Sequence, residues 1–148
     1  MAAVANPPAP LPRTRAGIRA FLGKGLLDEV VAACEAWRPV DPAASEWLLQ
    51  ADLAGGLKDR GFQVGREVRV GRGRVDLAVL CRDLMVGIEL KCGRPRPATV
   101  IGQLGRYARV GCFTGLVLVC ERAITVPETI AGVPVRAVGF GRAFGVAS

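Results

Sequence analysis

The first part of the chain shows helical spacing of its apolar residues in two segments. Between about residues 14 and 37, apolar positions recur every three or four residues, which predicts one or two short helices with Gly23 and Gly25 as the break. A further helix is predicted from Pro42 to about Arg60, with Asp41 as its cap and a stripe of leucines along one side. Two or three helices are therefore expected before the first strand.

The middle of the chain changes to the shorter period of β-strands. Runs rich in valine and leucine predict strands at Phe62–Val70, Arg74–Leu80 and Met85–Cys92. Residues 71–73 and 82–83 supply short turns between them. Because short turns join antiparallel neighbours, these three strands are expected to form an antiparallel meander.

One more helix and two more strands are predicted in the last third. The helix extends from Ala98 to Arg109 and ends near Gly111. Phe113–Cys120 is the most apolar run and is expected to be a central strand, and Val133–Phe140 is another strand after a short turn or helix at 127–131. A helix between strands favours a crossover to a parallel neighbour, so the predicted fold is an α/β sandwich with a central mixed β-sheet flanked by helices.

Length and composition fit a compact protein. Of the 148 residues, 51% are apolar and 22% are charged, which is enough to bury a sizeable core. Neither a transmembrane helix nor a secretory leader is predicted, so we expect a cytoplasmic protein with no membrane partner. We also expect an N-terminal arm and helical extension over residues 1–40, of which 1–12 are loosely attached, and a main domain over residues 41–148.

The residue types exclude several chemistries. The chain contains no histidine, so catalysis by Ser-His-Asp or Cys-His groups and zinc sites with histidine ligands are ruled out. The five cysteines contain no Cys-x-x-Cys pair and are expected to be free, buried and small apolar residues in a reducing compartment. The glycine-rich turns lack the spacing of a nucleotide-binding loop, so no organic cofactor is expected.

The positive charge of the chain is concentrated in its middle. The net charge is +7; residues 58–109 contain 12 Lys or Arg against 5 Asp or Glu, and the remainder contains 8 of each kind. An arginine-rich segment favours a polyanion such as DNA, because each phosphate contact releases counterions. A solvated basic face without a partner is the alternative. The arginines expected to contact nucleic acid are Arg72, Arg74, Arg94, Arg96 and Arg106.

Two of the predicted strands carry carboxylates among apolar neighbours. Alternation places Glu89 and Lys91 on the same side of one strand, and a hairpin would bring Asp76 of the preceding strand close to Glu89. Two adjacent carboxylates repel each other unless a proton or a cation intervenes, and oxygen-only ligation favours Mg²⁺ or Mn²⁺. A structural ion pair between Lys91 and a carboxylate, or an exposed face of a half-buried strand, is the alternative.

The helices contribute three further candidates. Glu46 falls within the leucine stripe, so its carboxylate is expected to face the sheet as an acidic or metal-positioning group. A glutamate favoured only by the helix dipole is the alternative for this position. Gln103 and Tyr107 are four residues apart and can face one side of the later helix, although a core tyrosine with a surface glutamine has the same spacing.

Taken together, these residues resemble the motif series of the PD-(D/E)XK nuclease superfamily. The chain is similar in particular to members with Gly-x-x-Asp, Glu-x-Lys and Gln-x-x-x-Tyr motifs, as in RecB-type nuclease domains and mismatch or flap nucleases of the NucS type. The resemblance covers about residues 42–125, and Val75 stands where the family has proline. The motifs here are Gly73-Arg74-Val75-Asp76, Glu89-Leu90-Lys91 and Gln103-Leu104-Gly105-Arg106-Tyr107.

The resemblance implies a restriction-endonuclease-like α/β sandwich and a metal site. Asp76, Glu89 and the carbonyl of Leu90 would ligate Mg²⁺, for which Mn²⁺ would substitute. Glu46 would complete the site directly or through water. Lys91 would position the attacking water or stabilise the charge on the phosphate.

The same resemblance implies the function. Gln103, counted among the catalytic residues, and Tyr107 would hold their helix against the site and contact the nucleic-acid backbone. We therefore expect a homodimeric, metal-dependent DNA nuclease that hydrolyses phosphodiester bonds. It would act as an endonuclease or structure-selective nuclease in DNA repair, recombination or phage and defence DNA processing. The alternative is a non-catalytic nucleic-acid-binding or assembly protein that retains the fold.

Overall fold

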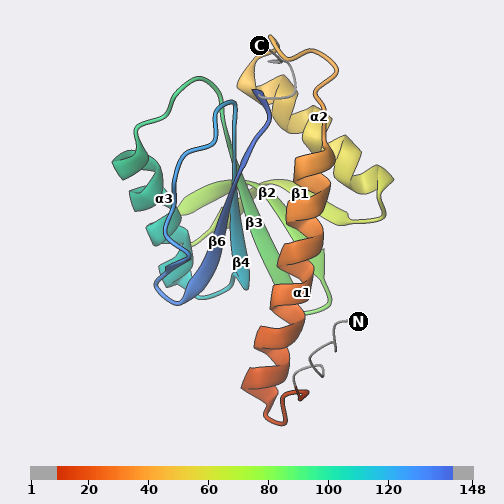
Figure 1. Ribbon diagram of the computed structural model, residues 1–148, viewed down its shortest axis with the longest axis vertical. Coiled ribbons are helices and arrows are strands. Elements are labelled where there is room, and N and C mark those ends of the chain that lie inside the picture. The colour runs from red at the N-terminus through yellow and green to blue at the C-terminus, as the bar shows by residue number, and fades with distance from the viewer. Residues whose placement is uncertain (1–9, 142–148) are drawn as a thin grey trace, which may run out of the picture.

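The computed structural model describes residues 10–141, which form three α-helices and a six-stranded mixed β-sheet (Figure 1). The predicted α/β class is confirmed. Among the described residues, none of the helices combines the length and apolar composition that a membrane span requires. In chain order the elements are α1 (Arg15–Ala36), α2 (Glu46–Asp59), β1 (Gln63–Val70), β2 (Gly73–Cys81), β3 (Leu84–Lys91), α3 (Pro97–Val110), β4 (Gly115–Cys120), β5 (Thr129–Ile130) and β6 (Val133–Gly139).

The strand order in the sheet is β1-β2-β3-β4-β6-β5. Antiparallel pairing joins β1 to β2 and β2 to β3, so the predicted meander is confirmed. The chain then crosses through α3 to β4, which pairs with β3 in parallel, as expected. All six residues of β4 are buried, and β4 lies inside the sheet between β3 and β6.

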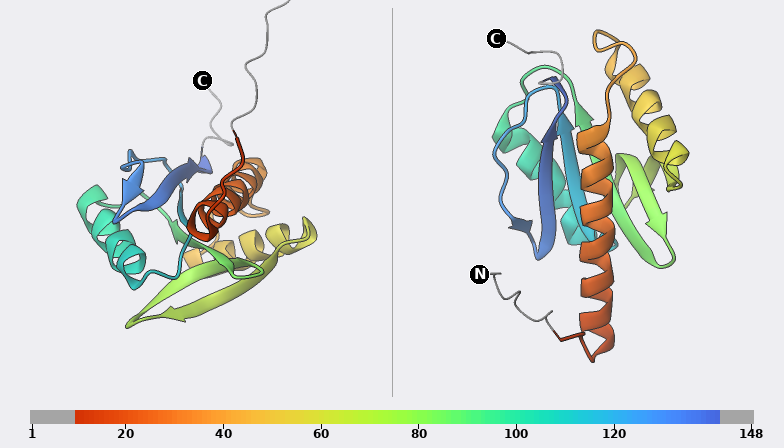
Figure 2. Two further views of the ribbon diagram at one scale, coloured as in Figure 1. Left: turned by 90° about the horizontal axis from the view of Figure 1, so that it is seen from below. Right: turned by 45° about the vertical axis from the view of Figure 1, so that its right-hand side comes forward.

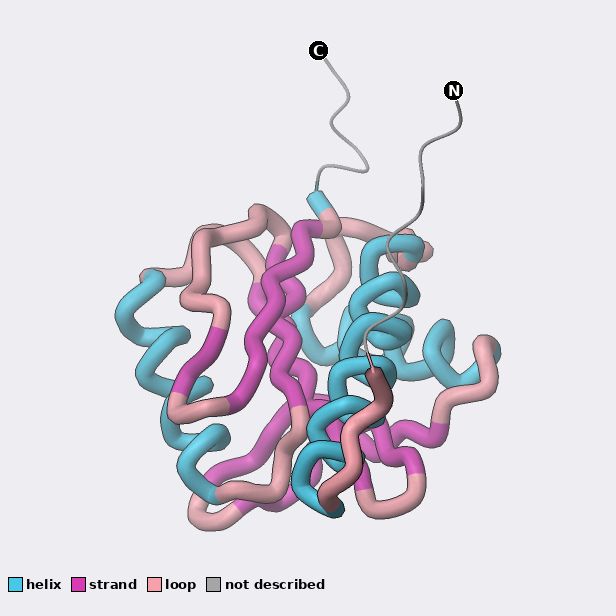
Figure 3. The backbone as a smooth tube through the Cα atoms, turned by 60° about the horizontal axis from the view of Figure 1, so that its bottom comes forward, coloured by secondary structure: helices cyan, strands magenta, loops and turns pink. Residues whose placement is uncertain are grey.

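Helices cover both faces of the sheet and divide the core into two halves. The first half contains apolar side chains of α1 and α2, packed against one face. The second contains α3 residues such as Leu104 and Tyr107, packed against the other face. Figures 2 and 3 show α3 on one side of the strands and the two other helices on the opposite side.

The first helix is continuous, which corrects the predicted break. Thr14 caps α1 by accepting a hydrogen bond from the N–H of Gly17 at 3.0 Å, and the helix continues past Gly23 and Gly25 to Ala36. Gly23 is buried, and a Cβ added there would lie 2.8 Å from the Cβ of Thr114. This glycine therefore lets the helix approach the start of β4 closely and does not interrupt it.

The second helix starts later than the sequence predicted. Asp41 accepts a hydrogen bond from the N–H of Ala43 at 3.0 Å and so forms a turn before the helix. Ser45 is the cap of α2, and Glu46 is its first residue. The correction matters for the site because it places Glu46 at the N-terminus of the helix.

Other differences are small. The segment 127–131 contains the short strand β5, paired antiparallel with β6, where a turn or helix was predicted. All five cysteines are free, but Cys81 is exposed, which corrects the expectation that all are buried. The helix α3 ends at Val110 and is capped by Gly111, whose φ of 84° is left-handed, so the predicted end near Gly111 is confirmed. Of the arm expected at residues 1–12, only residues 10–12 lie within the described part of the chain.

Two helical glycines give a test of this packing. We expect Gly55→Ala in α2 to raise the free energy of unfolding by up to about 1 kcal/mol, because alanine favours helix and an added Cβ meets nothing within 4 Å. Gly23→Ala should instead lower it, because its Cβ collides with Thr114. Urea unfolding of both variants at equal concentration measures the difference. Equal stabilisation by both substitutions would contradict the close approach of α1 to Thr114.

Candidate active site

Two carboxylates from neighbouring strands are joined through backbone groups. The N–H of Asp76 on β2 donates to Oε1 of Glu89 on β3 at 3.1 Å. The N–H of Leu90 donates in return to Oδ2 of Asp76 at 2.9 Å. Glu89 is only 2% exposed. The sequence-predicted pair is therefore brought together in a poorly solvated position.

The regular strand geometry is interrupted where these carboxylates meet. The β1–β2 register pairs Arg66 with Leu77 and Val68 with Val75, and skips Glu67 and Asp76 between them. The backbone of Glu67 has a φ of 52°, a left-handed conformation that residues with a side chain rarely adopt. Such local strain is typical of sites with a function beyond folding.

Lys91 lies beside the pair on the same strand. Its Nζ is 3.7 Å from Oε2 of Glu89, and its side chain is 27% exposed. The ammonium group thus faces both the buried carboxylate and solvent. The same ion pair fits the structural role for Lys91 that the sequence left open.

The third helix holds Glu89 from the other side. The hydroxyl of Tyr107 lies 3.1 Å from Oε1 of Glu89 and 2.7 Å from the carbonyl oxygen of Arg74, and it can donate its proton to either. Gln103 donates from Nε2 to the same hydroxyl at 3.1 Å. The i, i+4 pair of α3 therefore faces the site together, as the spacing predicted.

Glu46 approaches the site from α2. Its Oε2 accepts a hydrogen bond from the N–H of Cys92, just after β3, at 3.1 Å, and the residue as a whole is exposed. Glu46 therefore lies at the end of β3 and not against the apolar face of the sheet. Its charge is one of the lesser causes that raise the pKa of Asp76.

Burial raises the pKa of both central carboxyl groups. For Glu89, burial and then the charge of Asp76 raise the pKa to about 7, against the lowering effects of the Asp76 N–H, Lys91 and Tyr107. For Asp76, burial is again the main cause of a raised pKa, and the N–H of Leu90 and Lys91 oppose it. A proton or a cation between the two groups would reduce their mutual repulsion.

The donor set suits a hard divalent cation. Asp76 and Glu89 offer carboxylate oxygens, and the carbonyl of Leu90 faces the same neighbouring strand as its N–H. Among residues 10–141, no three side chains of His, Cys, Asp or Glu form a ready-made metal cluster. The two carboxylates and the Leu90 carbonyl are a donor set that fits an open site for Mg²⁺, which is often held by one or two carboxylates together with water and substrate phosphate.

Sequence reasoning missed a polar network behind Asp76. Gln50 on α2 is 3% exposed; it donates to Oε1 of Glu67 at 3.0 Å and accepts from Nε of Arg66 at 3.1 Å. The Arg66 guanidinium also stacks 4.3 Å from the ring centre of Trp47. Gln50 follows Glu46 by one helical turn within the leucine stripe, and that position could have identified it.

A groove rich in arginine lies next to the carboxylates. It has a volume of about 600 Å³ and forms between the β1–β2 turn and α3. Gln103 and Tyr107 belong to its lining, so the groove reaches the residues that hold Glu89. The arginines that line it are Arg72, Arg74, Arg106 and Arg109. The sequence prediction included three of them; Arg94 and Arg96 are exposed in the loop before α3 and do not line this groove.

Comparisons with protein families, with curated proteins and with solved structures found no match to this chain. The resemblance to PD-(D/E)XK nucleases consequently stays a prediction from the sequence motifs.

The raised pKa of Glu89 makes the stability of the metal-free protein depend on pH. The folded protein keeps a proton on Glu89 up to a pKa of about 7, whereas the unfolded chain releases it near 4.5. We therefore expect the contribution of Glu89 to the free energy of unfolding in EDTA to be highest below pH 4.5. It should fall by on the order of 3 kcal/mol as the pH rises through 7.

Urea unfolding between pH 4.5 and 7.5 measures this effect. Glu89→Gln should remove most of the fall, because the amide does not ionise. Asp83→Asn, at an exposed carboxyl group in the β2–β3 turn, should leave the fall unchanged. A wild-type profile as flat as that of Glu89→Gln would show that Glu89 is not held in this environment.

Proposed function

We propose that this protein is a metal-dependent DNA nuclease of the PD-(D/E)XK superfamily, with a restriction-endonuclease-like sandwich. The observation that carries the proposal is the joining of Asp76 and Glu89 across β2 and β3, with Lys91 beside them. A folded protein gains little from two partly desolvated carboxylates unless they bind something. Their position also follows the motif order named above.

In this proposal, Asp76, Glu89 and the Leu90 carbonyl would hold the metal. Mg²⁺, when bound, would supply a water of lowered pKa and positive charge next to the scissile phosphate. The N–H of Asp76 and the hydroxyl of Tyr107 fix Oε1 of Glu89, which orients Oε2 toward Lys91. The Lys91 ammonium would then orient the attacking water or offset the negative charge that develops on the phosphate.

The arginine groove supports nucleic acid as the substrate. Its lining contains four arginines and no carboxylate, which favours a phosphate backbone over a neutral or cationic ligand. Because Tyr107 lines the groove and contacts Glu89, a backbone lying there would pass the carboxylate pair. Arg94 and Arg96, just beyond Lys91 in the chain, would extend the basic surface on the other side of the pair.

Cleavage assays on linear, branched and single-stranded DNA test the proposal. We expect cutting with Mg²⁺ or Mn²⁺, binding with little cutting in Ca²⁺, and no cutting in EDTA. Asp76→Ala, Glu89→Ala and Lys91→Ala should each lower the rate by at least ~100-fold, the scale of losing one key electrostatic group. Asp83→Ala and Lys58→Ala, at exposed residues away from the pair, are the matched controls.

Two results would decide against the enzyme. DNA binding without cleavage under every metal condition would favour the non-catalytic binding protein that retains the fold. Cleavage at the wild-type rate by Lys91→Ala, with the protein folded, would mean that the activity arises elsewhere.

The groove gives a separate prediction about affinity. Replacing Arg72 and Arg106 together by alanine should weaken binding to all DNA sequences. It should also reduce the slope of log K against log salt concentration by about one or two units. Lys58→Ala with Arg60→Ala, two exposed cations at the end of α2, should have a smaller effect. Fluorescence anisotropy in Ca²⁺ between 50 and 200 mM salt, roughly the range over which such contacts weaken, measures both. An equal effect of the two double variants would remove the groove from the proposal.

A further inference from the structure

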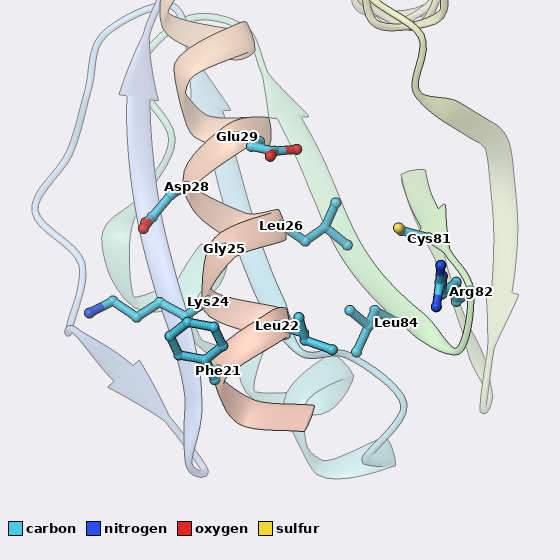
Figure 4. A pocket seen from close by; sticks show the side chains of 10 residues that line it. All are labelled: Phe21, Leu22, Lys24, Gly25, Leu26, Asp28, Glu29, Cys81, Arg82 and Leu84. Atoms are coloured by element: carbon cyan, nitrogen blue, oxygen red, sulfur yellow. The ribbon is translucent and has the colours of Figure 1, made fainter. Parts of the chain in front are cut away.

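A face of α1 far from the carboxylate pair exposes large apolar side chains. Ile18, Phe21 and Leu22 are 43%, 54% and 51% exposed and lie one helical turn apart. Phe21 and Leu22 line a groove of about 620 Å³ that continues to Leu84 at the start of β3. Figure 4 shows Leu22 beside Leu84, with Phe21 at the outer side of the helix.

Within the described residues 10–141, this part of α1 is less covered than the rest of the helix. The first buried residue of the helix is Gly23, so none of residues 15–22 is buried. In Figure 1 the corresponding half of α1 extends beyond the end of the sheet. Short helical segments without tertiary packing are marginal in water, and apolar patches on them are typical of protein contacts.

The order of charges along α1 indicates what the contact is. The exposed charges before Gly25 are all basic, and those after it are all acidic: Arg15, Arg19 and Lys24, then Asp28, Glu29 and Glu35. The first turn contains no acidic residue and the last turn no basic one, so this order opposes the dipole of the helix itself. An identical helix in antiparallel orientation would place acidic residues beside basic ones at both ends.

We propose that a second copy of this chain docks on this face, with the two α1 helices antiparallel about a two-fold axis near Leu22. Arg15, Leu22 and Glu29 are spaced by seven residues and follow one stripe of the helix. An axis at Leu22 places Arg15 of each copy opposite Glu29 of the other. Gly25 permits close approach of the second helix, because a Cβ added there would meet nothing within 4 Å of its own chain.

This interface is separate from the proposed nuclease function. The groove lies at the start of β3, at Leu84, whereas Glu89 and Lys91 lie near its end. Docking of a second copy therefore leaves the carboxylate pair and the arginine groove open. The interface can be tested without DNA or metal, so its failure would not count against the nuclease, nor the reverse.

The oligomeric state of the full chain tests the proposal. Light scattering coupled to gel filtration should give twice the chain mass of 15.6 kDa for the wild type. Phe21→Glu should give the monomer mass, because it places a charge in the apolar centre of the contact. Leu48→Glu is the matched control; Leu48 is 58% exposed on α2, and its replacement should leave the dimer intact.

Charge reversal tests the antiparallel register with exposed residues that do not affect folding of the core. Arg15→Glu and Glu29→Arg should each weaken the dimer by about fivefold in Kd, and more salt should reduce the effect. Mixing the two variants should restore a heterodimer of wild-type strength, because opposite charges then face each other. Sedimentation equilibrium measures all three dissociation constants.

Three outcomes would overturn the proposal. The first is a wild type that does not self-associate at high micromolar concentration, even if it binds a different protein. The second is a dimer or larger assembly that Phe21→Glu leaves unchanged. The third is a mixture of Arg15→Glu and Glu29→Arg that associates no better than either variant alone.

Discussion

Two hydrogen bonds that cross between β2 and β3 hold the carboxylate pair of this protein together. At Asp76 the ladder uses side-chain carboxylates as acceptors, one from each strand, in place of backbone carbonyls. The bonds hold two negative groups together where burial disfavours their charge. The strands meet here because their apolar residues on either side of Asp76 pack into the core, so packing energy offsets the repulsion.

The neighbouring elements compensate for this arrangement in different ways. Tyr107 fixes one oxygen of Glu89, Lys91 supplies a positive charge to the other, and Gln50 holds the strained Glu67 from behind. At Asp76 and Glu89 the strand pairing is irregular and a charged group is buried, whereas the rest of the sheet has regular pairing and apolar burial. Such coincidence is expected where a protein sacrifices stability for binding or catalysis.

The parts of the fold that the sequence predicted are those set by local periodicity. The meander, α3 and the buried β4 follow from alternation or helical spacing, and the pair Asp76 and Glu89 follows from the meander. The continuity of α1 did not follow from local periodicity. Gly23 is explained by the close approach of Thr114, which is remote in sequence. The role of Gln50 depends on the left-handed backbone at Glu67, which no pattern of residue types indicated.

The order of strands separates two parts of the molecule that can evolve independently. The tip of the β1–β2 hairpin carries Arg72 and belongs to the edge of the sheet, while Glu89 lies on β3 between two neighbours. Replacements of exposed side chains at the tip would leave the core register intact, since surface turns tolerate changes that buried strands do not. Because Arg72 is exposed at the turn and Glu89 is buried on β3, the side chains at the tip can change the charge of the groove without disturbing the packing around Glu89.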